Sequence, residues 1–184
     1  MGQAQKQTLY IEKFAENLAT FAINRDDLKE LLKPIPENSD LNLTTIEYEL
    51  QILKIISVGW SISFYLPHSD ENKKPLSELY WTYIREISKD ISNLTGTTTG
   101  QQIDYFSILK QRLDNYISVL QQHSEASSGT SGIIGSVFAD LCNVTDNPAA
   151  MLTGTKMFTY TIGSIKEYLG AVEIIKPSEA DNEN

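Results

Sequence analysis

TTIEYELQILKIISVGWSISFYL, residues 44–66, has apolar side chains at three- and four-residue steps, the spacing of an α-helix. At about 100° per residue, these side chains form two apolar sides. One side consists of Ile46, Leu50, Leu53, Trp60 and Phe64, and the other of Ile52, Ile55, Ile62 and Leu66. A helix with two apolar sides belongs in the middle of a bundle. We therefore expect a central apolar helix over about residues 45–66, capped at Thr44 and ended by Pro67.

Further helices are expected on both sides of this one. Residues 75–94 and the segment from Thr99 to about residue 122 repeat the helical apolar spacing, which predicts an αα-hairpin over about residues 75–122. No cluster of short Val, Ile and Thr runs predicts a strand. The sequence therefore predicts an all-α, single-domain bundle of six to seven helices over residues 1–177. A disordered acidic tail is expected at residues 178–184.

The glycine-rich stretch SSGTSGIIGS, residues 127–136, raises the question of a phosphate-binding loop. Such loops follow a buried strand and carry Gly-Lys-Ser/Thr, and this stretch does neither. It is therefore interpreted as a flexible joint that ends at Ser131, the expected N-cap of a sixth helix with Ile134, Val137, Phe138 and Leu141 on its apolar face. The first and last helices are expected at about residues 8–22 and 155–175. Gly163 and Gly170 on the outer side of the last helix either mark a close helix crossing or only weaken that face.

Composition excludes several classes of protein. The chain has 184 residues, a net charge of −9 and a single cysteine, so no intramolecular disulfide can form. An acidic surface disfavours direct binding to nucleic acid or to anionic membranes. The most apolar run, residues 55–66, is shorter than the ~20 residues that a membrane-spanning helix needs. We expect a cytoplasmic, bacterial protein.

Residues for catalysis are scarce. The chain has two histidines, His68 and His123, which are far apart in sequence and belong to no Glu-x-x-His motif. Cys142 is expected near a helix C-terminus, the end that does not activate a thiolate. No Gly-x-Ser-x-Gly nucleophile motif occurs. We therefore predict no catalytic residue and no cofactor.

Pairs of carboxylates offer an alternative. Glu12 and Glu16 are one turn apart on the first expected helix, and Glu86 and Asp90 are one turn apart on the fourth. Such pairs on facing helices can hold Mg²⁺ for phosphate chemistry. The simpler interpretation is a solvated helix face, although Asp90 falls close to the apolar stripe and is expected to be partly buried.

Arg112 stands out because it falls inside the apolar arc of its helix, near Tyr105 and Tyr116. A buried guanidinium needs acceptors, since it cannot lose its charge. One interpretation is a structural salt bridge to a carboxylate on another helix, for which the candidates are Asp90, Glu47 and Asp140. The other is an anion-binding pocket formed by Arg112 with the hydroxyls of Tyr105 and Tyr116.

Trp81 and Arg85 are one turn apart and rotated away from the main apolar stripe of their helix. An exposed tryptophan–arginine pair is typical of a partner-contact surface. The alternative is that another helix covers Trp81.

These observations favour a non-catalytic helical binding or regulatory module that acts through a protein partner or as a homo-oligomer. One alternative is a metal-dependent phosphohydrolase that uses the paired carboxylates. The other is an acidic mimic of nucleic acid that occupies a binding site on another protein.

Overall fold

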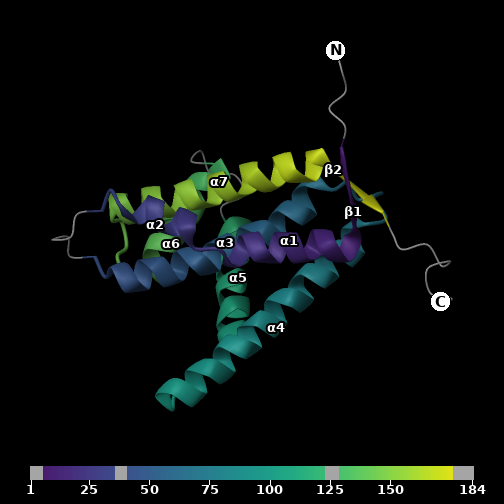
Figure 1. Cartoon of the computed structure of the whole chain (residues 1–184). Helices are drawn as coiled ribbons and strands as arrows, with labels where there is room; N and C mark the ends of the chain where they lie inside the picture. The colour runs from purple at the N-terminus through teal and green to yellow at the C-terminus, as the bar shows by residue number, and fades with distance from the viewer. Residues whose placement is uncertain (1–5, 36–40, 123–128, 176–184) are drawn as a thin grey trace.

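The computed structural model describes residues 6–35, 41–122 and 129–175, and helices dominate these residues (Figure 1). The expected all-α helical bundle is confirmed. The expected tail at residues 178–184 and the start of the glycine-rich stretch lie outside the described residues. The helices are α1 (Ile11–Ile23), α2 (Asp26–Leu32), α3 (Leu43–Tyr65), α4 (Lys73–Thr99), α5 (Tyr105–Gln122), α6 (Gly129–Leu141) and α7 (Pro148–Ala171).

The central helix is α3, which packs against each of the other six helices of the described chain. Both of its sides are buried, as its sequence predicts, with Leu53 and Ile62 inaccessible to solvent. Two details differ from expectation. The helix starts earlier, because the side chain of Asn42 rather than Thr44 accepts a hydrogen bond, from the backbone N–H of Thr45 at 3.1 Å. Phe64 is 62% exposed, because it lies in the last turn.

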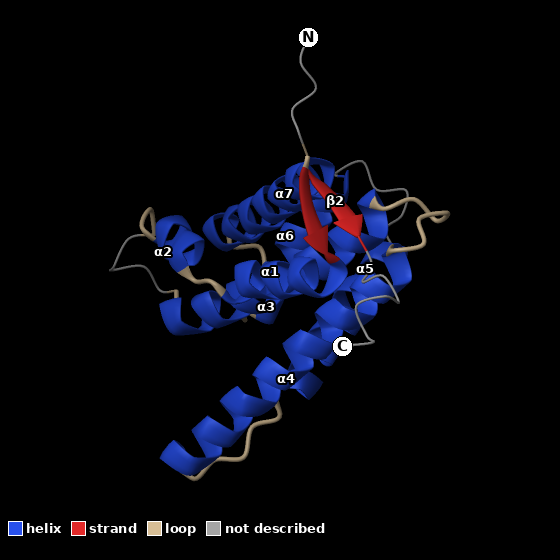
Figure 2. Ribbon diagram, turned by 45° about the vertical axis from the view of Figure 1, so that its right-hand side comes forward, coloured by secondary structure: helices blue, strands red, loops and turns tan. Residues whose placement is uncertain are grey.

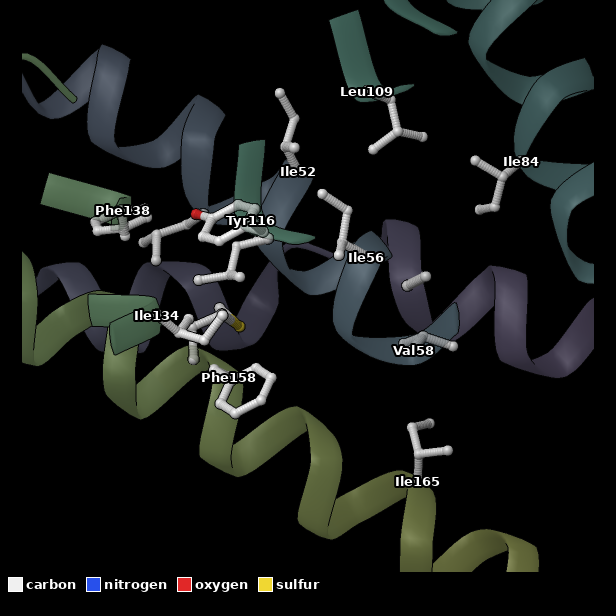
Figure 3. Packing of buried hydrophobic residues seen from close by; sticks show 14 of the residues in the cluster. Ile52, Ile56, Val58, Ile84, Leu109, Tyr116, Ile134, Phe138, Phe158 and Ile165 are labelled. Atoms are coloured by element: carbon white, nitrogen blue, oxygen red, sulfur yellow. The ribbon is translucent and has the colours of Figure 1, made fainter. Parts of the chain in front are cut away.

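Aromatic side chains join the core where α3, α5 and α7 meet. The ring of Trp60 on α3 lies edge-on to Tyr116 of α5 and to Phe158 of α7, with ring centroids 6.1 Å apart in each pair. Figure 3 shows Tyr116 and Phe158 among buried side chains that include Ile134 and Phe138 of α6. One continuous apolar cluster therefore connects the helices.

Helices α6 and α7 approach closely because glycines lie at their contact. A Cβ atom at Gly135 would meet Thr155 and lie 2.5 Å from the backbone oxygen of Met151. Gly129–Leu141 is helical, so the expected sixth helix is present but starts before Ser131, and the expected flexible joint is wrong for residues 129–131. Gly163 and Gly170, for which a close crossing and a merely weakened face were the two alternatives, have open space beside them, which excludes the crossing within the described residues.

Replacing Gly135 with alanine is expected to lower the free energy of unfolding by about 1–3 kcal/mol, because the methyl group would force α6 and α7 apart. Gly163→Ala is the matched control, and its effect is expected to be stabilising by up to about 1 kcal/mol, because alanine is the better helix former. Urea unfolding measures both. Equal stability of the two variants would contradict the close crossing.

The expected hairpin is confirmed, but α4 is longer than predicted. The TGTTTG segment continues the helix to Thr99, and Gly100 ends it with φ of 72°, in the left-handed region. α5 begins after Asp104, whose carboxylate accepts a hydrogen bond from the backbone N–H of Ser107 at 3.0 Å. The C-terminal half of α4 extends away from the rest of the bundle in both Figure 1 and Figure 2.

Two short strands join segments from near the two ends of the chain. β1 (Gln7–Tyr10) pairs in parallel with β2 (Val172–Ile175), so that Gln7 lies opposite Val172 (Figure 2). The expectation of no strand is therefore wrong for these eight residues, of which all but Gln7 were assigned to the terminal helices. Four residues are too few to show the alternation of a strand, and each strand forms only because the other is present.

Candidate functional site

Arg112 forms a buried salt bridge with Glu49 of α3. Its Nε donates to the two carboxylate oxygens at 3.1 and 3.0 Å, and its Nη2 donates to Oε1 at 2.7 Å. Glu49 is only 3% exposed, and the hydrogen bonds to it raise the pKa of Arg112. The three candidate partners were wrong, because Glu47 pairs with Arg25 at 2.7 Å instead and the other two are exposed.

The tyrosines predicted beside Arg112 have different surroundings. Tyr116 is fully buried, its hydroxyl has no hydrogen-bond partner among the described residues, and burial raises its pKa well above the ordinary value. Tyr105 lies nearer the surface, where its ring packs on Tyr48 with centroids 6.3 Å apart. Arg112 is already engaged by Glu49. The geometry thus favours the structural interpretation of Arg112.

Burial raises the pKa of the Cys142 thiol to about 12, with the charge of Glu49 acting in the same direction and that of Arg112 opposing it. The unfolded thiol has a pKa of about 8.5. Above that pH the unfolded chain releases a proton that the folded chain retains, so stability falls as pH rises. We expect Cys142→Ala to reduce the slope of unfolding free energy against pH between pH ~8.5 and ~10 by an amount that corresponds to about one proton. Urea unfolding across this range measures the slope, and an unchanged slope would contradict the burial of the thiol.

The paired carboxylates do not assemble into a metal site. Glu12 and Glu16 lie on α1, Glu86 and Asp90 lie on α4, and all four are exposed, including Asp90, which was expected to be partly buried. Over residues 6–35, 41–122 and 129–175, no group of three or more potential ligand side chains could hold a metal ion. The metal-dependent alternative therefore has no geometric support.

Trp81 and Arg85 do not form a joint exposed surface. The Trp81 ring is half-buried against Gly59 of α3, where a Cβ atom on the glycine would lie 2.5 Å from the ring. The centroid of the Trp81 ring is 5.2 Å from that of the Tyr80 ring. Arg85 is exposed and lines a different hollow with Lys89, between α4 and α5. Helix α3 thus covers part of the Trp81 ring, which favours the alternative interpretation.

Sequence reasoning missed an apolar groove between α3, α4 and α5, bounded also by the end of α1. It consists of two adjoining cavities of about 230 and 150 Å³ that share five lining residues, among them Ile55 and Ile91. Ile84 of α4 and Leu109 of α5 face one another beside it in Figure 3. We call it the isoleucine groove; its lining residues are Ile23, Arg25, Tyr48, Gln51, Ile52, Ile55, Ile84, Ile87, Ser88, Ile91, Tyr105 and Leu109.

The apolar stripe of α4 continues from the core into this groove and past it. Tyr80 and Ile84 are buried, whereas Ile91 is 45% exposed and Leu94, in the following turn, is 68% exposed. Ile23 at the end of α1 adds a side chain that is 37% exposed. The sequence predicted the stripe correctly, but not that its last two turns leave the bundle, because spacing does not show where neighbouring helices end.

A second cavity, of about 720 Å³, lies between α2 and α7 and is lined by Asp26, Asp27, Glu30, Leu31, Lys156, Thr159 and Tyr160. At its edge Asp27 pairs with Lys54, which is only 1% exposed, at 2.8 Å. The Lys54 ammonium also donates to the backbone oxygen of Asn24 at 2.8 Å. Burial lowers the pKa of Lys54, and the hydrogen bond to Asp27 opposes this. The pair fastens the α1–α2 turn to α3.

No protein-family model, curated protein or solved structure matches this chain. None of the helices over residues 6–35, 41–122 and 129–175 has the length and apolar character needed to cross a membrane. The candidate site is therefore judged by its own geometry.

Proposed function

We propose that this protein is a cytoplasmic binding module without catalysis of its own, and that it holds a protein partner in the isoleucine groove. The observation that carries the proposal is the exposed apolar stripe of α4, where Ile91 and Leu94 are 45% and 68% exposed at a groove in which half of the lining residues are isoleucine. Exposed apolar patches of this kind mark interaction sites in soluble proteins.

The shape of the groove also supports a protein partner. Apolar side chains from α1, α3, α4 and α5 line it, and the α4 stripe extends it by a further turn, so that several anchoring side chains can dock in a row. Grooves between helices accept the apolar face of another helix in this way. Buried aliphatic anchors in the centre of such an interface supply most of the binding energy.

The test compares Ile91→Asp with Leu152→Asp. Leu152 is likewise an exposed aliphatic residue, with 54% of its surface accessible, but it lies on α7 away from the groove. Each tagged variant is used to capture partners from a lysate of the native host. We expect wild type and Leu152→Asp to capture a partner protein that Ile91→Asp does not capture. The two variants are expected to have similar melting temperatures. Retention by Ile91→Asp would contradict the proposal.

A further inference from the structure

We infer that the occupant of the isoleucine groove is an amphipathic helix with basic residues beside its apolar face. This inference rests on the proposed function and identifies the chemistry of the partner. Its basis is the charge beside the exposed stripe of α4, where Glu86 and Asp90 lie one turn apart. Both carboxylates are exposed, and neither pairs with another side chain in the described part of the protein.

The two carboxylates lie on the open flank of the stripe. On α4 they directly precede Ile87 and Ile91, whereas the serines that follow these isoleucines turn toward α5. Ser92 accepts a hydrogen bond from the backbone N–H of Tyr105 at 3.3 Å, which fixes that side of α4 against α5. At about 100° per residue, the carboxylates therefore face away from α5, beside any helix that covers the stripe.

Among the residues that the structure describes, no cation in the lining of the groove compensates these charges. Arg25 is the one charged residue among the described lining residues, and Glu47 pairs with it at 2.7 Å. The basic residues of α4 that are nearest in sequence to the two carboxylates, Arg85 and Lys89, line a separate hollow with Phe106. Beyond Asp90, residues 91–99 of α4 carry no charge at all. The rim of the groove thus holds two uncompensated negative charges.

The same charges disfavour a second copy of this chain as the occupant. If the α4 stripes of two copies packed together, Glu86 and Asp90 of one would lie near the same carboxylates of the other. Like charges across an interface suppress a wrong pairing, and the net charge of −9 on each copy adds to the repulsion. A helix with lysine or arginine at the flanks of its apolar face would instead place positive charges beside Glu86 and Asp90, which would attract it.

Three synthetic helical peptides test the inference. They share one apolar face, with leucine at steps of three and four residues, and carry lysine, glutamine or glutamate on both flanks. Fluorescence anisotropy measures their binding to the full chain. We expect the lysine peptide to bind about tenfold more tightly than the glutamate peptide, the preference expected from a few exposed charge pairs. Salt near 1 M shortens the screening length to about 3 Å and is expected to remove most of the preference.

Charge-reversal variants separate local from overall charge. Glu86→Lys with Asp90→Lys is expected to reverse the preference in favour of the glutamate peptide. The matched control is Asp140→Lys with Glu167→Lys, which changes the net charge equally at exposed positions of α6 and α7 and is expected to keep the wild-type preference. Loss of the preference in both double variants would overturn the inference, because the selection would then follow net charge.

The remaining outcomes distinguish this inference from the proposed function. Equal binding of all three peptides, lost in Ile91→Asp, would overturn the basic partner and leave the groove as a binding site. Binding unaffected by Ile91→Asp, or absent for every peptide, would overturn the helical occupant. A wild-type dimer in light scattering that becomes monomeric in Ile91→Asp would show that a second copy fills the groove, and would overturn the inference as well.

Discussion

Replacing Arg112 with methionine is expected to lower the free energy of unfolding by about 3–5 kcal/mol, because it strands a buried charge. Glu49 is only 3% exposed, and the guanidinium supplies three hydrogen bonds to its carboxylate. Without Arg112 this carboxylate either remains charged among apolar side chains or takes up a proton, and both cost stability. Urea unfolding of the variant measures the loss.

The double variant Arg112→Met with Glu49→Leu is the informative comparison. Removing both partners eliminates the stranded charge, so stability is expected to return close to that of wild type. The exposed pair Lys13–Glu16, at 2.8 Å, provides the control, since removing Lys13 is expected to cost less than about 1 kcal/mol. If Arg112→Met alone were as stable as wild type, the Arg112–Glu49 salt bridge would not have the structural role that we describe.

Replacing Asp27 with asparagine is expected to cost about 3 kcal/mol, because the ammonium of Lys54 then loses its counter-charge. Lys54 is 1% exposed. Its ammonium then retains the backbone oxygen of Asn24 and the ring of Phe21, whose centroid lies 4.4 Å from the ammonium nitrogen. The α1–α2 turn is expected to loosen from α3 as a result. Thermal and urea unfolding both measure this effect.

The pH dependence of the Asp27→Asn variant provides a second measurement. Burial lowers the pKa of Lys54 in the folded protein, and loss of Asp27 removes the hydrogen bond that opposes this. Between the lowered pKa and the unfolded value of about 10.4, the unfolded chain binds more protons, so stability rises with pH. The difference in unfolding free energy between wild type and the variant is therefore expected to shrink toward pH ~10. In a Lys54→Met background, Asp27→Asn is expected to change neither the free energy of unfolding nor its pH dependence. A loss of stability that persists in this background would contradict the Asp27–Lys54 salt bridge.

Spacing alone predicted the elements that depend on local sequence. The central helix and the hairpin follow from apolar side chains at three- and four-residue steps, and both are present. Asn42 shows the limit of this approach, because it takes the capping role that a motif assigned to Thr44, two residues later. The strands at Gln7–Tyr10 and Val172–Ile175 depend on each other across the whole chain, so no local pattern revealed them.

The site was harder to predict because it depends on where helices cross and end. Arg112 was identified as a buried cation, but its partner, Glu49, was not, since partner choice requires knowing which turn of α3 meets α5. Ile91 and Leu94 belong to the apolar spacing that predicted a helix over residues 75–94, and their exposure reflects the projection of α4 past its neighbours. Residue type and spacing thus identified the side chains, while tertiary structure decided their roles.

The pairing of β1 with β2 also sets an order of events during synthesis. Gln7 is added to the chain 165 residues before its partner Val172, so β1 waits without its neighbour while the intervening residues are synthesised. At about 5–20 residues per second, that interval lasts roughly 8–33 s. Meanwhile the first helices can already pack together, and closure of the strand pair is left as a late step in the maturation of the nascent chain.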